Sequence, residues 1–123
     1  MAGEALRKLI DLLEQASAEV RRLEAEGDAV IKTEGQLAFQ ARMEKKAEVL
    51  AGLAEKAAPL TAEMDGALGK FADDRLIRFS TSAATALRIG SVFFMTALLY
   101  PEEHKPGEPN DLEVFIGELR EKA

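Results

Sequence analysis

The most apolar part of the sequence runs from residue 80 to residue 100 and contains a single charged residue, Arg88. Charged residues are frequent on both sides of it and make up 31% of the chain. A stretch this apolar must either cross a membrane or be covered by the rest of the protein. This choice limits what the chain can fold into.

The composition of residues 80–100 argues against a membrane span. Arg88 lies near the middle, where a charge costs about 2.5–3.5 kcal/mol on insertion scales. The almost fully apolar part, residues 92–100, is too short, because crossing a bilayer takes roughly 20 residues. Small and hydroxyl residues add to the cost: Ser80, Thr81, Ser82, Thr85, Gly90, Ser91 and Thr96. We therefore expect a buried helix.

Apolar and small residues recur here at alternating steps of three and four, which is typical of a buried helix face. One row consists of Leu76, Phe79, Ala83, Ala86, Gly90, Phe93, Ala97 and Tyr100. A second row beside it consists of Ile77, Ala84, Leu87, Ser91, Phe94 and Leu98. Two adjacent rows make a wide apolar face, as in a core helix. We predict one helix over 73–100, capped by Asp73 or Asp74 and stopped by Pro101.

Length and composition predict a single all-α domain. A chain of 123 residues has the size of one domain, here 1–123. Hydrophobic residues make up 47% of it, and Ala, Leu, Glu, Lys and Arg dominate, as in long helices. No run alternates apolar and polar residues as a half-buried β-strand does.

Residues 4–32 have the pattern of one long helix with a heptad-like row, formed by Leu6, Leu9, Leu13, Ala16, Val20 and Leu23. The helix ends either at residue 27, where Gly27 and Asp28 resemble a helix end and a new cap, or near residue 32. The first turn is therefore expected at 27–28 or at 32–35. Both positions give the same hairpin.

A further row predicts a second helix over 36–68, formed by Phe39, Met43, Leu50, Leu53, Ala57, Leu60, Met64 and Ala67. Lys46 alone interrupts it. Pro59 removes a backbone hydrogen bond, so the helix is kinked or divided there. Because the row keeps its phase, we expect a kink near Pro59. After a proline-rich loop over 101–110, Asn110 is expected to cap a short helix over 111–122.

These elements predict an antiparallel helical bundle of three long helices with heptad-like seams plus a short C-terminal helix. A long hairpin with narrow seams often needs a partner. We therefore expect a protein partner or a second copy of the chain, with a homodimer favoured.

Charge and cysteine content exclude several classes of protein. The net charge of −6 argues against nucleic-acid binding, which normally needs a basic face, and weakly against anionic membrane surfaces. The absence of cysteine excludes disulfides, thiol catalysis and thiolate metal sites. Together with the lack of a secretory signal pattern, this predicts a cytoplasmic protein.

No residue pattern indicates catalysis, a metal or a cofactor. The only histidine, His104, lies in the proline-rich loop, whereas metal sites usually need several imidazoles or thiolates. Hydroxyl residues of the core helix have no histidine to activate them, and no glycine-rich phosphate loop is present. Six glutamates lie off the apolar rows and are expected to face water: Glu14, Glu24, Glu44, Glu48, Glu55 and Glu63. We expect no enzyme, no cofactor and no small-molecule ligand.

Arg88 is the one charged residue of the apolar stretch, and it shares a helix face with Thr81 and Thr85. It could bind a phosphate or a partner's carboxylate. The favoured interpretation is structural: an ion pair with another helix, or an aliphatic stem on apolar surface with its head in water.

The end of the apolar stretch is a cluster of bulky residues: Phe93, Phe94, Met95, Leu98, Leu99 and Tyr100. The simplest interpretation is core covered by residues 112–119. The alternative is an interface for an apolar helix, because methionine and aromatic residues adapt well to such partners. In both cases Phe93→Asp or Leu98→Asp is expected to unfold the chain or break an oligomer.

The sequence favours a non-enzymatic helical interaction protein, such as an adaptor, an assembly factor or a chaperone-like protein. The alternative is a lipid- or membrane-surface-associated protein that uses residues 80–100 as an anchor. A metal-binding or enzymatic bundle is the least favoured hypothesis.

Overall fold

The computed structural model describes residues 2–123, which form six helices and no strand. The helices are α1 (Ala2–Thr33), α2 (Gln36–Ala51), α3 (Leu53–Thr61), α4 (Gly66–Ile89), α5 (Val92–Ala97) and α6 (Asp111–Glu121). The predicted all-α fold class is confirmed: α1, the α2–α3 pair and α4 are the three long packed elements, and α6 is the short C-terminal helix.

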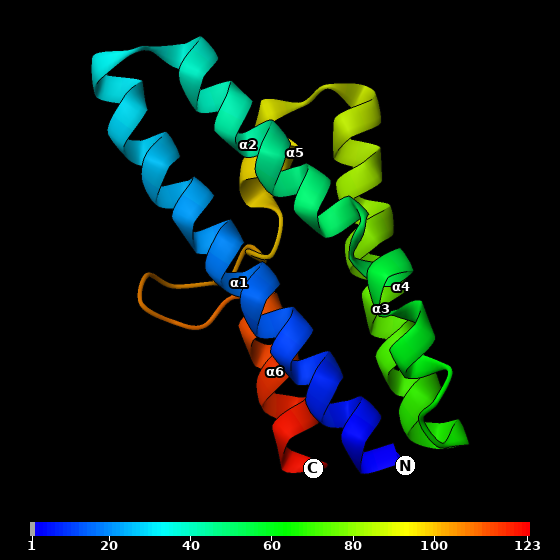
Figure 1. Ribbon diagram of the computed structural model, residues 1–123. Coiled ribbons are helices and arrows are strands. Elements are labelled where there is room, and N and C mark those ends of the chain that lie inside the picture. The colour runs from blue at the N-terminus through cyan, green and yellow to red at the C-terminus, as the bar shows by residue number, and fades with distance from the viewer. Residues whose placement is uncertain (1) are drawn as a thin grey trace.

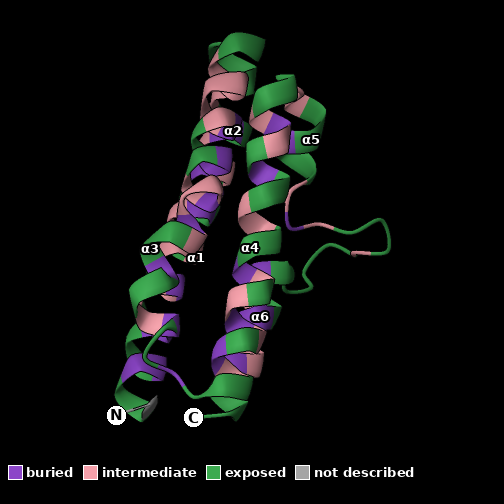
Figure 2. Cartoon of the chain, turned by 90° about the vertical axis from the view of Figure 1, so that its right-hand side faces the viewer, coloured by how far each residue is buried: buried purple, intermediate pink, exposed green. Residues whose placement is uncertain are grey.

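The helices lie in two layers (Figures 1 and 2). One layer contains the hairpin of α1 with α2 and α3, and the other contains α4, α5 and α6. Across the layers, α4 packs on α2 and α3, α5 packs on α2, and α6 packs on α1. The start of α1 and the end of α6 lie at the same end of the molecule.

The core lies between the two layers and uses the predicted rows of α1 and α2. Leu9, Leu13, Leu50 and Leu53 are almost fully buried, and each such side chain contributes about 1.5–3 kcal/mol. From α6, Phe115 enters this core, and its ring lies 5.9 Å from the rings of both Phe71 and Phe79. Leu112, Ile116 and Leu119 form the rest of the buried face of α6.

The first turn lies at 34–35, after Thr33, which settles the alternative that the sequence left open. Gly35 has a φ of 92°, which favours glycine. Gly27 remains inside α1 for a packing reason. A Cβ atom there would lie 3.0 Å from Met43 Cε and 3.2 Å from Phe39 Cδ1, so glycine allows α2 to approach α1 closely.

The expected kink near Pro59 is wrong, because the second helix divides at Gly52 instead. The hydroxyl of Ser80 on α4 compensates for this break. It donates to the carbonyl oxygen of Leu50 at 2.9 Å and accepts from the backbone N–H of Ala54 at 3.0 Å. Pro59 lies in the last turn of α3, which ends at Thr61 and not at residue 68.

The expected helix over 73–100 is also wrong, because it begins earlier and is two helices. Asp65 caps α4 by accepting a hydrogen bond from the backbone N–H of Leu68 at 3.2 Å. Gly69 lies in the first part of α4. A Cβ atom there would lie 2.9 Å from the carbonyl oxygen of Thr61, so glycine is needed for this close approach.

The loop over 101–110 and α6 agree with the sequence pattern. Asn110 and Glu113 form a capping box, with Asn110 Oδ1 accepting from the Glu113 N–H at 2.9 Å and Glu113 Oε1 accepting from the Asn110 N–H at 2.8 Å. The backbone N–H of Asp111 donates to the carbonyl oxygen of Leu99 at 3.0 Å. The start of α6 is thus tied to the segment that follows α5.

Candidate functional site

The chain turns sharply between α4 and α5. Gly90 ends α4 in the left-handed conformation, with a φ of 73°, and its N–H donates to the carbonyl oxygens of Ala86 and Leu87. The hydroxyl of Ser91 then caps α5 by accepting from the N–H of Phe94 at 3.1 Å. These two residues place α5 beside α4 instead of extending it.

The turn exposes two aromatic side chains of α5. Phe93 is 76% exposed and Phe94 is 50% exposed, whereas the neighbouring Met95 is 1% exposed. The two rings lie 5.8 Å apart, edge to face. In a straight helix Phe93 would continue the buried row of Ala83 and Ala86, so the break at Gly90 is what brings it to the surface.

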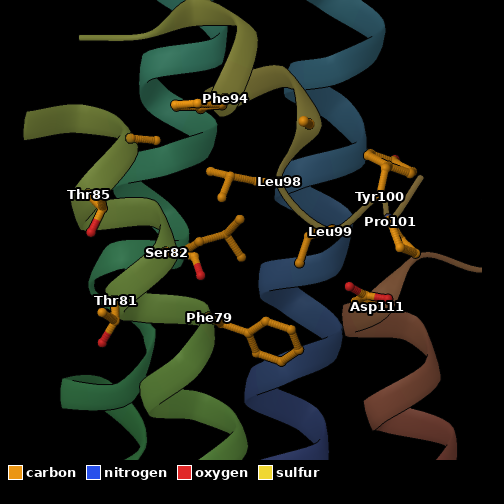
Figure 3. A pocket seen from close by; sticks show the side chains of 13 residues that line it. Phe79, Thr81, Ser82, Thr85, Phe94, Leu98, Leu99, Tyr100, Pro101 and Asp111 are labelled. Carbon is orange, nitrogen blue, oxygen red and sulfur yellow. The ribbon is translucent and has the colours of Figure 1, made fainter. Parts of the chain in front are cut away.

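A cavity of about 500 Å³ lies between α4 and α5, as Figure 3 shows. The hydroxyl groups of the lining all lie on the α4 wall, at Thr81, Ser82 and Thr85, and this wall also includes Phe79 and Ala86. Apolar groups of α5 and the segment after it form the facing wall, chiefly Phe94, Ala97 and Leu98. The cavity is therefore polar along one side and apolar along the other.

A second cavity of about 360 Å³, between α4 and α6, continues the first. The two share Phe79, Ser82 and Asp111, and Arg75, Arg78 and Val114 line only the second. Together they form one channel along α4, here called the α4 groove. Among the residues that the structure describes, Asp111 is the only acidic side chain lining this groove.

The arginines of α4 differ in their surroundings. Arg75 pairs with Glu118 at 3.0 Å and lies over the rings of Phe71 and Phe115. Arg78 and Arg88 are exposed and belong to no ion pair within residues 2–123. Arg78 lines the groove, whereas Arg88 lies outside the lining, three residues beyond Thr85 on the same face of α4.

The position of α5 depends on a buried lysine. The side chain of Lys46 on α2 is 0% exposed, and its ammonium group donates to the carbonyl oxygen of Thr96 at 3.0 Å. The same group lies 3.0 Å from the carboxylate of Glu24 on α1 and 5.1 Å from the centre of the Tyr100 ring. Carbonyl groups at a helix end lack partners within the helix, so Lys46 stabilises the end of α5.

Tyr100 extends this network to α6. Its hydroxyl donates to Glu24 at 2.8 Å and accepts from Arg21 at 3.0 Å. Arg21 also donates to both carboxylate oxygens of Glu113, at 2.6 Å and 3.2 Å. The network thus joins α1, α2, the end of α5 and α6. It therefore fixes the position of α5, which forms one wall of the α4 groove.

The network changes three pKa values. Burial lowers the pKa of the Lys46 ammonium group, and the Glu24 carboxylate opposes this change. Burial, and then the hydrogen bond to Glu24, raise the pKa of the Tyr100 phenol. The hydrogen bond from Arg21 holds the pKa of Glu113 below its usual range.

A cavity of about 650 Å³ lies beside this network, lined by residues that include Arg21, Glu24, Lys46 and Tyr100. These charged groups already bond to one another or to Glu113. They therefore offer a ligand little unsatisfied charge. The α4 groove, whose lining residue Arg78 has no carboxylate partner in the described part of the chain, is the stronger candidate site.

The predicted cluster divides between surface and interior. Phe93 and Phe94 are exposed, Met95 and Leu99 are buried, and Leu98 and Tyr100 are half-buried. Phe94, Leu98, Leu99 and Tyr100 line the α4 groove. The structure thus brings most of the cluster to one groove but covers Met95 fully.

Arg88 is exposed, and His104 is partly exposed. The exposure of Arg88 agrees with a head group in water and not with an ion pair to another helix. The ring of His104 lies 4.9 Å from that of Tyr100, and its Nε2 is 2.9 Å from the carbonyl oxygen of Glu108. Within residues 2–123, no group of His, Asp and Glu side chains is arranged to hold a metal.

Sequence reasoning missed the pair of Lys46 and Glu24. Glu24 was expected to face water, but its side chain is only 18% exposed. The signal was present as the single charge in the apolar row of α2. A lysine at such a position has to be buried with a partner, and the partner had to come from the facing helix α1.

Comparison of the chain with protein-family models, curated proteins and solved structures gave no match. In addition, no helix between residues 2 and 123 is both long enough and apolar enough to span a bilayer.

Proposed function

We propose that this chain is a non-enzymatic helical interaction protein, of the adaptor, assembly-factor or chaperone-like kind, that holds an apolar segment of a partner in the α4 groove. The observation that carries the proposal is the exposure of Phe93 and Phe94 on α5, with Phe94 on the wall of the groove. Exposed aromatic groups beside a concave apolar surface are typical of sites that bind a partner helix.

The fixed position of α5 supports this proposal. Lys46 holds the end of the helix through the Thr96 carbonyl, and Ser91 caps its start. A wall held at both ends loses little conformational freedom on binding, and this favours affinity. The lining supports binding more than chemistry, because it consists of apolar groups, hydroxyls, arginines and one carboxylate.

The membrane-surface alternative has less support. Phe94 and Leu98 line a concave groove, whereas interfacial helices present a continuous apolar face to lipid. The helix that carries the exposed rings, α5, has only six residues. A cytoplasmic location remains part of this proposal and is in keeping with the absence of cysteine.

Selection from a displayed library of random peptides tests this function. Wild-type protein and the Leu37→Asp variant, whose change lies on an exposed residue at the α1–α2 turn, are expected to enrich the same apolar peptides. The Phe94→Asp variant is expected to lose them, because it places a charge on the groove wall. If no peptide is enriched, or if Phe94→Asp retains the same peptides as wild type, the α4 groove is not a binding site.

A further inference from the structure

We infer that the segment held by the α4 groove is an acidic amphipathic helix of another protein. This inference rests on the proposed function and adds the chemistry of the partner.

The first argument is the distribution of charge along the chain. The chain has 22 acidic residues and a net charge of −6, but residues 75–101 contain three arginines and no acidic residue. This segment supplies the α4 wall and the α5 wall of the groove. The groove is therefore a basic and apolar surface on an acidic protein, and such a surface favours partners that carry negative charge.

The second argument is the position of the two unpaired arginines. Arg78, Thr81, Thr85 and Arg88 follow one another at steps of three, four and three, so they lie along one face of α4. At 1.5 Å per residue, Arg78 and Arg88 are about 15 Å apart along the helix axis. A partner helix of about three turns spans this distance and can place an acidic residue near each arginine.

The apolar wall defines the other face of the partner. Leu98 lies toward Ser82 of α4, and Phe94 lies farther along the same apolar wall (Figure 3). A helix lying between the two walls would turn its apolar residues to α5 and its polar residues to Thr81, Thr85 and the two arginines. This two-sided lining matches an amphipathic helix better than a uniformly apolar one.

Asp111 is the one negative group of the lining and lies at the α6 end of the groove. It occupies the first turn of α6. Burial raises the pKa of the Asp111 carboxyl group, and the charge of Arg75 opposes this change. Arg78 on the α4 wall, and Arg88 beyond Thr85 on the same face of α4, have no carboxylate partner within residues 2–123. The groove lining therefore carries two arginines, Arg75 and Arg78, and one carboxylate, Asp111.

Charge also argues against a second copy of this chain in the groove. A second copy that used the same face would bring the three further arginines of its residues 75–101, with Asp111 as the only acidic lining residue. Like charges placed together at an interface weaken it. Acidic residues of a different protein provide the missing complement.

The test uses three labelled peptides of about 14 residues, held helical by a side-chain lactam because short helices are marginal in water. They share a face of Leu and Phe and carry Glu, Gln or Lys on the other face. Fluorescence anisotropy measures binding to wild-type protein, to Phe94→Asp, to Arg78→Ala/Arg88→Ala and to the control Arg7→Ala/Lys56→Ala. The control removes two exposed positive charges outside the groove.

The Glu peptide is expected to bind tightest and the Lys peptide weakest. Removal of Arg78 or Arg88 should each weaken binding of the Glu peptide about two- to fivefold, as for exposed ion pairs, and leave binding of the Gln peptide unchanged. Added salt should reduce the difference between the Glu and Gln peptides. The control variant should bind all three peptides as wild type does.

Equal affinity for the Glu and Gln peptides, both lost in Phe94→Asp, would overturn this inference and leave the proposed function standing. If none of the three peptides binds, or if Phe94→Asp binds them as wild type does, both are overturned. Light scattering that shows a dimer unable to bind the Glu peptide would assign the groove to a second copy. Displacement of the Glu peptide by phosphatidylserine vesicles would assign it to a membrane surface, and both results would overturn the inference.

Discussion

The buried ammonium group of Lys46 lies 3.0 Å from the carboxylate of Glu24, and this ion pair joins α2 to α1 at the point where α5 ends. Lys46 also donates to the carbonyl oxygen of Thr96. The wall of the α4 groove formed by α5 therefore depends on a charge inside the protein.

Replacing this lysine should destabilise the fold strongly. Lys46→Met removes the ammonium group from Glu24, which keeps the Tyr100 hydroxyl and Arg21 at 3.7 Å. Breaking a buried pair costs about 3–5 kcal/mol, and these remaining partners place the loss at the lower end of that range. Urea unfolding followed by circular dichroism measures the loss, and Lys46→Met/Glu24→Gln should recover much of it. The exposed neighbour provides the control, since Lys45→Met should change stability by less than about 0.5 kcal/mol. Equal effects at the two positions would show that the Lys46 pair does not support the fold.

The hydroxyl of Tyr100 should contribute stability that depends on pH. Tyr100→Phe removes a hydrogen bond to a carboxylate, which is worth about 1.5–3 kcal/mol. Because burial and Glu24 raise the pKa of Tyr100 above its unfolded value of 10.0, this stabilisation is complete below that pH and is lost as the pH rises through the folded pKa. The difference in unfolding free energy between wild type and variant should therefore shrink at high pH.

The same residue allows a direct optical measurement. The chain has one tyrosine and no tryptophan, so the ultraviolet absorbance of the phenolate form reports the ionisation of Tyr100 alone. Its titration in the folded protein should lie at higher pH than in urea. A folded midpoint at or below the unfolded one would mean that the phenol does not donate to Glu24.

The ion pair between Arg21 and Glu113 should stabilise α6 at neutral pH. Since Arg21 holds the pKa of Glu113 below 4.5, the stabilisation is present above pH 4.5 and is lost as the pH falls through the folded pKa. Glu113→Gln should cost about 1 kcal/mol at pH 7, because the pair is partly exposed, and much less near pH 3. The control Glu121→Gln, at the exposed end of α6, should show no such pH dependence. A constant difference at both pH values would exclude the ion pair as its cause.

Replacement by alanine should change the stability of the protein in opposite directions at two glycines. Gly90 has a φ of 73°, so Gly90→Ala strains the turn that places α5 and should cost about 1–2 kcal/mol. Gly117 lies within α6 with open space where a Cβ would be, so Gly117→Ala should stabilise by about 0.5–1 kcal/mol. Thermal unfolding compares the two variants. A neutral Gly90→Ala would mean that the left-handed turn is not required.

Much of the bundle could be predicted from the sequence, because apolar rows determine which helix faces are buried. The rows that contain Leu9 and Leu50 are buried in the structure, and the second row stays buried on both sides of the break at Gly52. The breaks themselves were misplaced. Tertiary contacts compensate for the helix break at Gly52, and a left-handed turn ends the helix at Gly90. Gly27 and Gly69 stay helical, and no local sequence pattern distinguishes them from Gly52 and Gly90.

The candidate site was predictable only in part. Phe93, Phe94 and Leu98 were recognised as interface candidates, but the favoured interpretation placed them in the core, and Phe93 is the most exposed of them. Its exposure follows from the turn at Gly90, so Phe93→Asp should leave the fold intact, contrary to the expectation from the sequence. The groove could not be predicted, because its α4 wall and its α5 wall meet only after the chain reverses.

The most direct test of the α4 groove is to map the Glu peptide onto the protein by backbone chemical-shift changes of the ¹⁵N-labelled chain. The account predicts that the largest changes lie along the two walls, near Thr81, Thr85, Phe94 and Leu98, and that signals around Leu37 stay in place. Changes centred on the α1–α2 turn, or spread evenly over the chain, would contradict it.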